Sequence, residues 1–320
     1  MTAQQVAEAP SPLAGRDVRP ARAKRVGGRL PSFWLFVGPF LVGMLFFVFV
    51  PLGWGFLLSF FKAVGTVTPK DFVGFQNYAA VLNDSAFTSS LVTFSLFALF
   101  IVPLTFFLSL GLAILVNQLS VARAFFRSVF FLPTACSYVV ASLVWKLSLF
   151  NGVRFGLANT ILGAFGHAPI AWLSTVSPPW YWVPLVTVRL WLQLGFYMIL
   201  FIAGLLNIPD DLYEASYVDG ARPGWQTFRF ITFPQLRPMS IAVLLLLLIG
   251  AYQAFDEFYN LIGNADFARP PLVYLYYTAL GASQDYGKGS AGAFILALII
   301  VIVTLLQAKV FGFGKSAADR

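Results

Sequence analysis

Residues 214–238 read EASYVDGARPGWQTFRFITFPQLRP and separate two long apolar segments of the chain. The stretch carries acids, arginines, glycines and prolines, whereas 59% of the 320 residues are hydrophobic and only 11% are charged. An ordinary soluble domain has roughly a quarter of its residues charged. The composition therefore favours a protein whose solvent is the lipid bilayer, with residues 214–238 in a connection between two membrane spans.

Six apolar segments approach the roughly 20 helical residues that cross about 30 Å of hydrocarbon. They cover residues 33–61, 91–116, 125–150, 181–206, 239–260 and 290–313. The third segment is interrupted by Pro133, Ser137 and Lys146. The sequence predicts an all-α membrane protein, with six transmembrane helices in a domain over residues 31–315 and a connecting loop at 207–238.

Lysine and arginine residues are distributed unequally between the connections. Most of the 21 lie in residues 1–30, the second–third loop, the fourth–fifth loop and the C-terminal segment. Cytoplasmic connections of membrane proteins carry this excess of positive charge. We therefore expect both termini and the 207–238 loop in the cytoplasm, and a disordered basic tail at residues 1–30.

The net charge of +8 does not indicate nucleic-acid binding, because the basic residues flank apolar spans instead of forming an aromatic-interleaved patch. Membrane lipid is the expected surrounding. A single cysteine, Cys136, excludes an internal disulfide and a multi-cysteine metal site. Gly314-Lys315-Ser316 lacks the preceding glycine of a phosphate-binding loop, since Lys309 stands there.

Catalytic residues are also scarce. The chain has one histidine, His167, and no pair of carboxylates placed for acid–base chemistry. We therefore expect no enzyme activity, no cofactor and no metal on this chain, and a translocation subunit whose energy comes from elsewhere.

The polar loop has helix signals of its own. Asp210 and Asp211 are suited to an N-cap and first turn, and a helix from about 211 to 218 can end at Gly220 in a left-handed conformation. Pro223-Gly224 predicts a turn. A second short segment is then expected to lie against the bundle through its apolar residues, which are Trp225, Phe228, Ile231 and Leu236.

The same loop strongly resembles the EAA loop of ATP-binding-cassette importer permeases, through Glu214-Ala-Ser216, Gly220 and Ile231-Thr-Phe-Pro234. Further segments resemble carbohydrate permeases of the maltose and glycerol-phosphate type in the same order along the chain. They include Phe72-Val-Gly-Phe-Gln-Asn-Tyr78, Phe126-Arg-Ser-Val-Phe-Phe-Leu-Pro133, Phe155-Gly-Leu-Ala-Asn159 and Ala254-Phe-Asp-Glu-Phe258. The resemblance covers nearly all of the chain after residue 32.

The resemblance implies the type I importer permease fold, in which the loop forms a coupling helix that docks on an ATPase subunit. The residues carried over to that role are Glu214, Ala215, Ser216, Asp219, Gly220, Ala221 and Pro234. Glu214 and Asp219 would face outward. The chain departs from the pattern at Ser216 and Phe233, and by one extra residue between Gly220 and Ile231, which we place at Pro223-Gly224. Gly263–Pro270 replaces the glycine-rich segment usual after the fifth span.

Polar residues in the fourth and fifth spans are candidates for a substrate pathway, because they are costly within lipid. Amide and aromatic side chains suit sugars, although each could instead pack or bond between helices. The candidates are Gln193, Tyr197, Tyr252, Gln253, Asp256, Glu257 and Asn260. Arg189 and Asp256 form either an intramembrane ion pair or substrate contacts, and the sequence leaves both open.

We therefore expect one permease subunit of a binding-protein-dependent carbohydrate importer, which forms half of the path in a prokaryotic cell membrane. The implied partners are a second related permease, two ATPase subunits that bind ATP and Mg, and an extracytoplasmic solute-binding protein. Alternatives are an importer of a glycerol phosphate ester, an ion-coupled secondary transporter and a non-transporting scaffold or sensor. Secondary transporters favour inverted repeats, and the sequence has no evident repeat.

Overall fold

The computed structural model describes residues 30–311, and every regular element within that range is a helix. The only β-type pairs in this range are two isolated bridges, Phe61 with Phe72 and Val64 with Asp285. The expected all-α fold is confirmed. Residues 1–29 and 312–320, which hold the predicted basic tail and Gly314-Lys315-Ser316, lie outside the described residues.

The chain divides into two units at Gly53, and the boundary falls inside a helix. The first unit contains α1 (Leu30–Met44), the π-helical turn η2 (Leu45–Phe49) and the start of α2 (Val50–Leu58). The helical run Phe33–Leu58 is long and apolar enough to cross a bilayer. Apolar side chains occur on all sides of this run, which is typical of a helix in contact with lipid.

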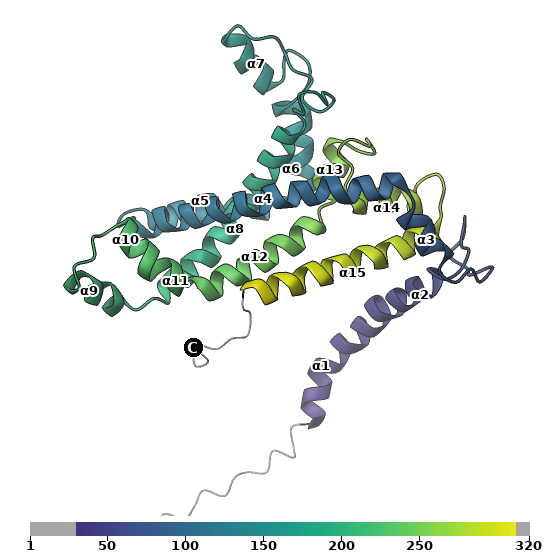
Figure 1. Ribbon diagram of the computed structural model, residues 1–320, viewed down its shortest axis with the longest axis horizontal. Coiled ribbons are helices and arrows are strands. Elements are labelled where there is room, and N and C mark those ends of the chain that lie inside the picture. The colour runs from purple at the N-terminus through teal and green to yellow at the C-terminus, as the bar shows by residue number, and fades with distance from the viewer. Residues whose placement is uncertain (1–29, 312–320) are drawn as a thin grey trace, which may run out of the picture. The chain divides into compact units, whose positions relative to one another are not determined.

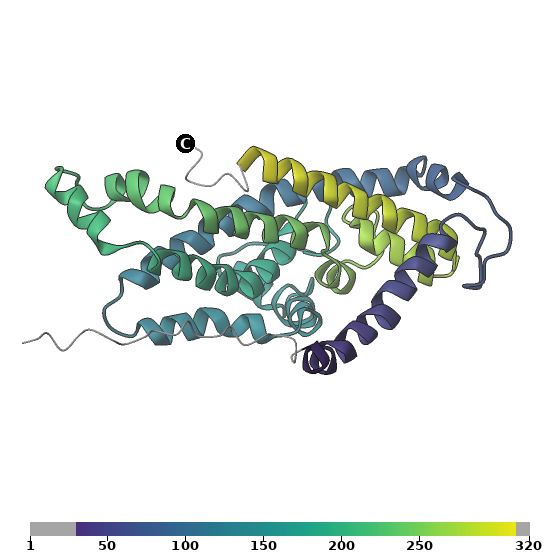
Figure 2. The same ribbon diagram turned by 90° about the horizontal axis from the view of Figure 1, so that it is seen from below.

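The second unit is a bundle built around α4 (Ser85–Gln118), which has 34 residues. It packs against α8 (Trp182–Leu206) and α12 (Arg237–Tyr252), and α12 packs against α15 (Tyr286–Phe311). Figures 1 and 2 show these helices side by side. Large side chains such as Phe94, Phe201 and Phe258 are fully buried between them. Because lipid tails are as apolar as these rings, close packing holds such a bundle together.

Small residues allow two of the helix crossings. A Cβ atom on Gly195 of α8 would lie 1.9 Å from the carbonyl oxygen of Phe130 in α5 (Arg123–Phe131). A Cβ atom on Gly204 would lie 2.9 Å from a side-chain carbon of Leu236. At Gly195 the two backbones therefore meet at a separation that only glycine permits, whereas the atoms near Gly204 belong to the side chains of Leu236 and Met239.

The third predicted span is not one straight helix. It consists of α5, the 3₁₀ turn η3 (Leu132–Ala135), α6 (Tyr138–Val144) and the π-turn η4 (Trp145–Leu149), with a bend of 94°. Pro133 has no N–H to donate, and Cys136 and Ser137 have extended backbones, which explains the break. α6 and the following α7 (Leu157–Ala164) leave the bundle in Figure 1.

The fifth predicted span is also interrupted. α12 ends at Tyr252, and α13 (Asp256–Leu261) begins after the three residues Gln253–Phe255. The second, fourth and sixth predicted spans correspond to single apolar helices, Ser85–Gln118, Trp182–Leu206 and Tyr286–Lys309. The described residues therefore hold five helical runs able to cross a membrane, or six with the bent pair.

The two ends of the second unit carry different elements, as both ribbon views show. One end, called here the α9 end, holds α9 (Asp210–Val218), α10 (Trp225–Thr227), the π-turn η5 (Phe228–Thr232) and α11 (Phe233–Gln235). The opposite end, the α14 end, holds α3 (Gln76–Leu82) and α14 (Pro271–Leu280). The two candidate functional regions lie at the α9 end and at the helix breaks.

Candidate coupling loop and translocation cavity

The helix predicted at about 211–218 is present as α9, and its C-terminus has the expected left-handed cap. Gly220 has φ +85°, its N–H donates to the Tyr217 carbonyl at 3.1 Å, and the Ala221 N–H donates to the Ser216 carbonyl at 2.9 Å. This pair of bonds is the Schellman motif. The N-terminus differs from expectation, because Pro209 is the N-cap and Asp210 and Asp211 both lie within the first turn.

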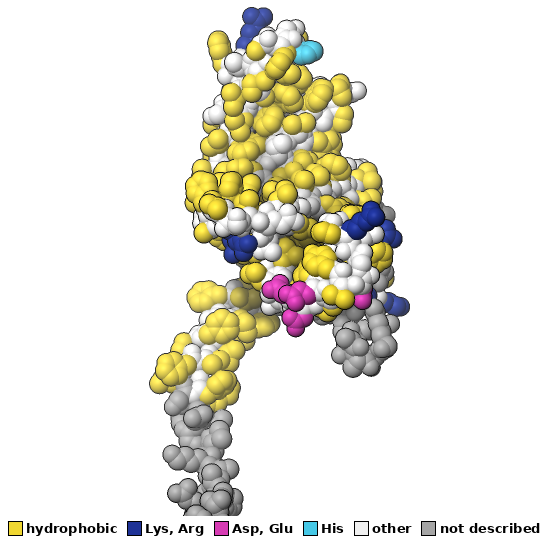
Figure 3. Space-filling model, turned by 90° about the vertical axis from the view of Figure 1, so that its left-hand side faces the viewer, with side chains coloured by type: hydrophobic (Ala, Val, Ile, Leu, Met, Phe, Trp, Pro, Cys, Tyr) yellow, Lys and Arg dark blue, Asp and Glu magenta, His cyan; other side chains and the backbone are white. Residues whose placement is uncertain are grey.

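The acidic residues of α9 face outward. Glu214 and Asp219 are exposed, as are Asp210 and Asp211. Apolar residues share this surface, since Tyr217 and Val218 are 48% and 88% exposed. Figure 3 looks onto this end and shows acidic side chains beside hydrophobic ones. Of the other predicted coupling residues, Ala215, Gly220 and Pro234 are exposed, and Ser216 and Ala221 are partly buried.

The second half of the loop is helical and contains a π-turn. The Phe233 N–H donates to the Phe228 carbonyl, five residues earlier, whereas an α-helix uses a separation of four. Thr227, Thr232 and Leu236 are buried. In an α-helix, residues five apart would point in different directions. The π-turn is wider than an α-helical turn, and it therefore keeps Thr227 and Thr232 on the same side. Leu236 packs inward as predicted, but Trp225 is 70% exposed, so its predicted contact with the bundle is wrong.

A contact between two hydroxyl groups joins α9 to this second half, since those of Tyr213 and Thr232 lie 3.1 Å apart. In the segment after α9, the Thr227 hydroxyl donates to the Arg222 carbonyl at 3.0 Å. A cavity of about 240 Å³ lies beside this junction, with Asn117 at the end of α4 in its wall. The two halves of the loop are therefore tied to each other through buried hydroxyl groups.

A second, polar cavity of about 210 Å³ lies where the third and fifth spans are interrupted. Tyr138 follows the bend of the third span, and Gln253–Phe255 form the break of the fifth. Four of the predicted pathway residues line this cavity, namely Gln193, Gln253, Asp256 and Glu257. The structure thus brings together residues that the sequence assigned to two separate spans.

The ion pair in this cavity differs from the predicted one. Arg189 pairs with Glu257 instead of Asp256. The two side chains are 3% and 2% exposed, and a second guanidinium nitrogen of Arg189 donates to the Gly250 carbonyl at 2.7 Å. Asp256 opens α13 and is half-buried. Because adjacent residues of a helix point about 100° apart, only one of these two carboxylates turns inward to α8.

The remaining predicted pathway residues have other surroundings. Tyr197 is buried beside Gly250, and the hydroxyl groups of Tyr252 and Ser95 lie 3.3 Å apart. The Asn260 amide donates to the Asp256 carbonyl at 2.7 Å. None of these three lines the polar cavity, so the structure separates them from the other four.

Sequence reasoning missed two polar residues here. The Tyr138 hydroxyl accepts a hydrogen bond from the Gln193 amide at 2.9 Å, and the Lys146 ammonium donates to the Asn260 carbonyl at 2.8 Å. Lys146 could have been found, because a lysine within a span is a marker of function or pairing. Tyr138 has no such signal beyond its place after the Pro133 break.

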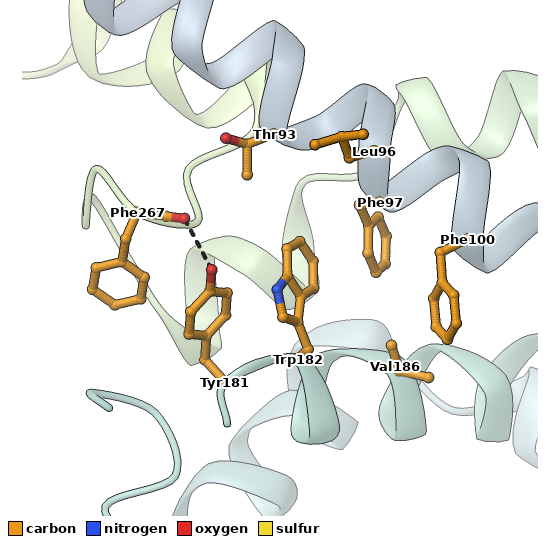
Figure 4. A pocket seen from close by; sticks show the side chains of 8 residues that line it. All are labelled: Thr93, Leu96, Phe97, Phe100, Tyr181, Trp182, Val186 and Phe267. Carbon is orange, nitrogen blue, oxygen red and sulfur yellow. Dashed lines mark hydrogen bonds between the residues drawn. The ribbon is translucent and has the colours of Figure 1, made fainter. Parts of the chain in front are cut away.

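A third cavity, of about 520 Å³, has mainly apolar walls from α4, the start of α8 and Phe267 (Figure 4). The rings of Phe97 and Trp182 stack with centroids 5.1 Å apart, and the Tyr181 hydroxyl donates to the Phe267 carbonyl at 3.3 Å. No charged side chain is among the residues that line it. The described residues also contain no group of three His, Cys, Asp or Glu side chains that could hold a metal ion.

Comparison with known proteins identifies the chain's relatives. No family model matches the sequence. The chain is 33% identical over 287 residues to the trehalose/maltose transport system permease protein of Thermococcus litoralis, covering 88% of this chain and 94% of that protein. It is 32% identical over 312 residues to the arabinooligosaccharides transport system permease protein of Bacillus subtilis, with coverages of 92% and 95%.

A solved structure has the same fold. It is a bacterial alginate ABC transporter in complex with an alginate pentasaccharide-bound periplasmic protein. One of its chains matches with a TM-score of 0.75 and 21% identity, over 89% of this chain and 96% of that chain. Fold and relatives agree, and the chain belongs to the family of ATP-binding-cassette importer permeases that includes these carbohydrate-transport proteins.

Proposed function

We propose that this chain conducts a carbohydrate across a prokaryotic cell membrane as one of two permease subunits in an ATP-driven importer. The permeases of this family are transport subunits and not enzymes. In the proposal, two partner ATPases bind ATP and Mg, and an extracytoplasmic binding protein delivers the sugar. Relatives named for trehalose, maltose and arabinooligosaccharides support the substrate class.

The observation that carries the proposed path is the polar cavity at two helix breaks. Irregular backbone at membrane depth is tolerated only where it is buried in protein or lines a water-filled cavity. Gln193 and Gln253 offer amide groups to this cavity and Tyr138 offers a ring and a hydroxyl group. Such groups suit the apolar faces and the hydroxyl groups of sugars.

The charges of the cavity favour a sugar over a glycerol phosphate ester. Arg189 is the only Lys or Arg among the residues that line it, and its charge is already paired with Glu257. Asp256 adds a further carboxylate to the wall. A phosphate group would therefore meet a negative wall instead of the arginine cluster that usually binds it.

The surface of α9 supports the proposed contact with the ATPase. Exposed apolar side chains with polar neighbours mark protein interaction sites, and Val218 stands beside Glu214 and Asp219 on such a surface. α9 directly connects α8 to the segment that leads into α12. A displacement of α9 would thus act on both helices that flank the polar cavity. The excess of Lys and Arg supports a cytoplasmic α9 end.

Purification from membranes tests the assignment. We expect a stoichiometric ATPase and a second permease to co-purify with the chain. Hydrolysis of ATP by the complex in proteoliposomes should rise when the sugar-loaded binding protein is added. Sugar transport by the isolated chain, driven by an ion gradient without ATP, would contradict the proposal in favour of a secondary transporter.

A further inference from the structure

The broken fifth span has two helix C-termini, one at the break and one at the end of the span. α12 ends at Tyr252 and α13 ends at Leu261. The last four carbonyl groups of a helix have no partner within it, and the helix carries partial negative charge at that end. Such groups need partners when they are removed from water.

A cation from another helix meets each of these ends. On α12, Arg189 of α8 donates to the Gly250 carbonyl at 2.7 Å and pairs with Glu257 of α13. The guanidinium group thus contacts both sides of the break. On α13, Lys146 of η4 donates to the Asn260 carbonyl at 2.8 Å. α13 is therefore held from α8 at its start and from the bent third span at its end.

The position of α13 determines which side chains face the polar cavity. Asp256 is its first residue, and Gln253 and Phe255 lie in the non-helical segment before it. All three line the polar cavity. A helix of 6 residues has little stability of its own, since isolated helices need about 12–15 residues to form in water. Its orientation must come from contacts with its neighbours.

We propose that Lys146 and Arg189 are positioning residues, which hold the two ends of α13 so that Gln253 and Asp256 face the translocation cavity. Neither cation needs to touch the sugar for this role. The proposal rests on the proposed function for the identity of the cavity as a sugar path. The effect of these two cations on the position of α13 can be measured without any substrate.

Thiol labelling in the purified transporter complex measures which way the cavity wall faces. The exposed Cys136 is first removed by Cys136→Ser, and Gln253→Cys or Asp256→Cys then introduces the only thiol of this chain, whose labelling is followed on this chain alone. The rate of reaction with a trimethylammonium methanethiosulfonate reagent reports access from water. We expect Lys146→Met to lower the rate for Asp256→Cys at least fivefold, and Lys146→Arg to restore it.

The arginine needs a different variant, because removing it alone leaves Glu257 buried without a partner. The double change Arg189→Met with Glu257→Met removes both charges and keeps the volume. It should also lower the labelling rate at least fivefold, while the amount of assembled complex is retained. The matched control is Arg154→Met, an exposed cation outside the cavity, for which the rate should not change.

Hydrogen exchange of residues 253–261 provides a second readout. We expect exchange in this segment to speed at least tenfold in Lys146→Met and in the double variant, with no change in Arg154→Met. If Lys146→Met and the double variant assemble but leave both the labelling rate and the hydrogen exchange unchanged, the proposal is overturned. If the introduced thiols fail to label while Lys146 and Arg189 are both present, the proposed water-filled path is contradicted. Hydrogen exchange then still tests whether the two cations position α13.

Discussion

At the scale of single residues, Asp84 joins three helices at the α14 end. Its carboxylate accepts from the Ala86 N–H of α4 at 2.9 Å, from the Tyr274 hydroxyl of α14 at 2.6 Å and from the Lys288 ammonium of α15 at 2.8 Å. Burial alone would raise the pKa of Asp84, but these hydrogen bonds outweigh it and lower the pKa from 3.8 to about 2.

This lowered pKa predicts how stability depends on pH. A carboxyl group with a depressed folded-state pKa stabilises the protein above its unfolded pKa, and the stabilisation is lost as the pH falls through the folded value. Asp84 should therefore contribute fully above about pH 4 and lose its contribution towards pH 2. Thermal unfolding of Asp84→Asn and the native chain in detergent should give differences that shrink over this range. A constant difference from pH 6 to pH 2 would contradict the assignment.

Gly195 sets the distance between α5 and α8. A methyl group at this position would meet the backbone of Phe130, and overpacking of this kind costs about 1–3 kcal/mol. We predict that Gly195→Ala lowers the unfolding temperature and the amount of assembled complex. Gly111→Ala in α4 is the matched control, because no atom beyond the adjoining backbone of its own helix lies within 4 Å of its added Cβ. Equal stability of the two variants would show that the crossing is looser than described.

The ion pair shows how far residue-level prediction reached in the candidate site. A charged residue within a span needs a partner or a substrate, and the sequence analysis named Asp256 of the fifth span as the candidate partner of Arg189. The structure pairs Arg189 with Glu257 instead, because the choice between these two acids depends on the rotation of α13. That rotation follows the break at Gln253–Phe255, where the sequence has neither glycine nor proline. Arg189 and Lys146, whose contacts hold α13 in place, come from distant parts of the chain.

At the scale of elements, the coupling loop shows where an extra residue can be placed. The sequence suggests Pro223-Gly224, and the structure offers a second position in the π-turn at Phe228–Thr232, because such a turn contains one residue more than the equivalent α-helical turn. The helix that ends at Gly220 is formed as expected. The register of the buried face is kept by the π-turn, which single-sequence patterns of apolar residues do not reveal.

Deletions test this interpretation of the loop. Removal of Phe230, which is 71% exposed in the π-turn, would leave Thr227 and Thr232 four residues apart on one α-helical face. We predict that this deletion retains most ATP-driven transport. Removal of Gly224, whose φ of +99° suits glycine, should abolish transport, because Pro223 cannot adopt that conformation. The reverse order of activities in proteoliposomes would place the extra residue at the turn.

At the scale of the whole molecule, hydropathy and charge were enough to predict an all-helical membrane protein, and the loop motif was enough to indicate its family. Long apolar runs leave few alternatives to spanning helices. The bend of the third span was signalled by Pro133, whereas the polar cavity was not visible in the sequence. It arises from contacts among α6, α8 and α13, which only the folded chain brings together.

In the proposed function, this chain imports a sugar by receiving ATP-driven movement through α9. The most direct test is Glu214→Lys in the reconstituted importer, with sugar uptake and ATP hydrolysis measured in the same proteoliposomes. Asp71→Lys, an exposed acid outside the loop, is the matched control. We predict that Glu214→Lys lowers uptake at least tenfold while the ATPases still hydrolyse ATP, and that the control transports normally. Uptake by Glu214→Lys at the native rate would contradict the account.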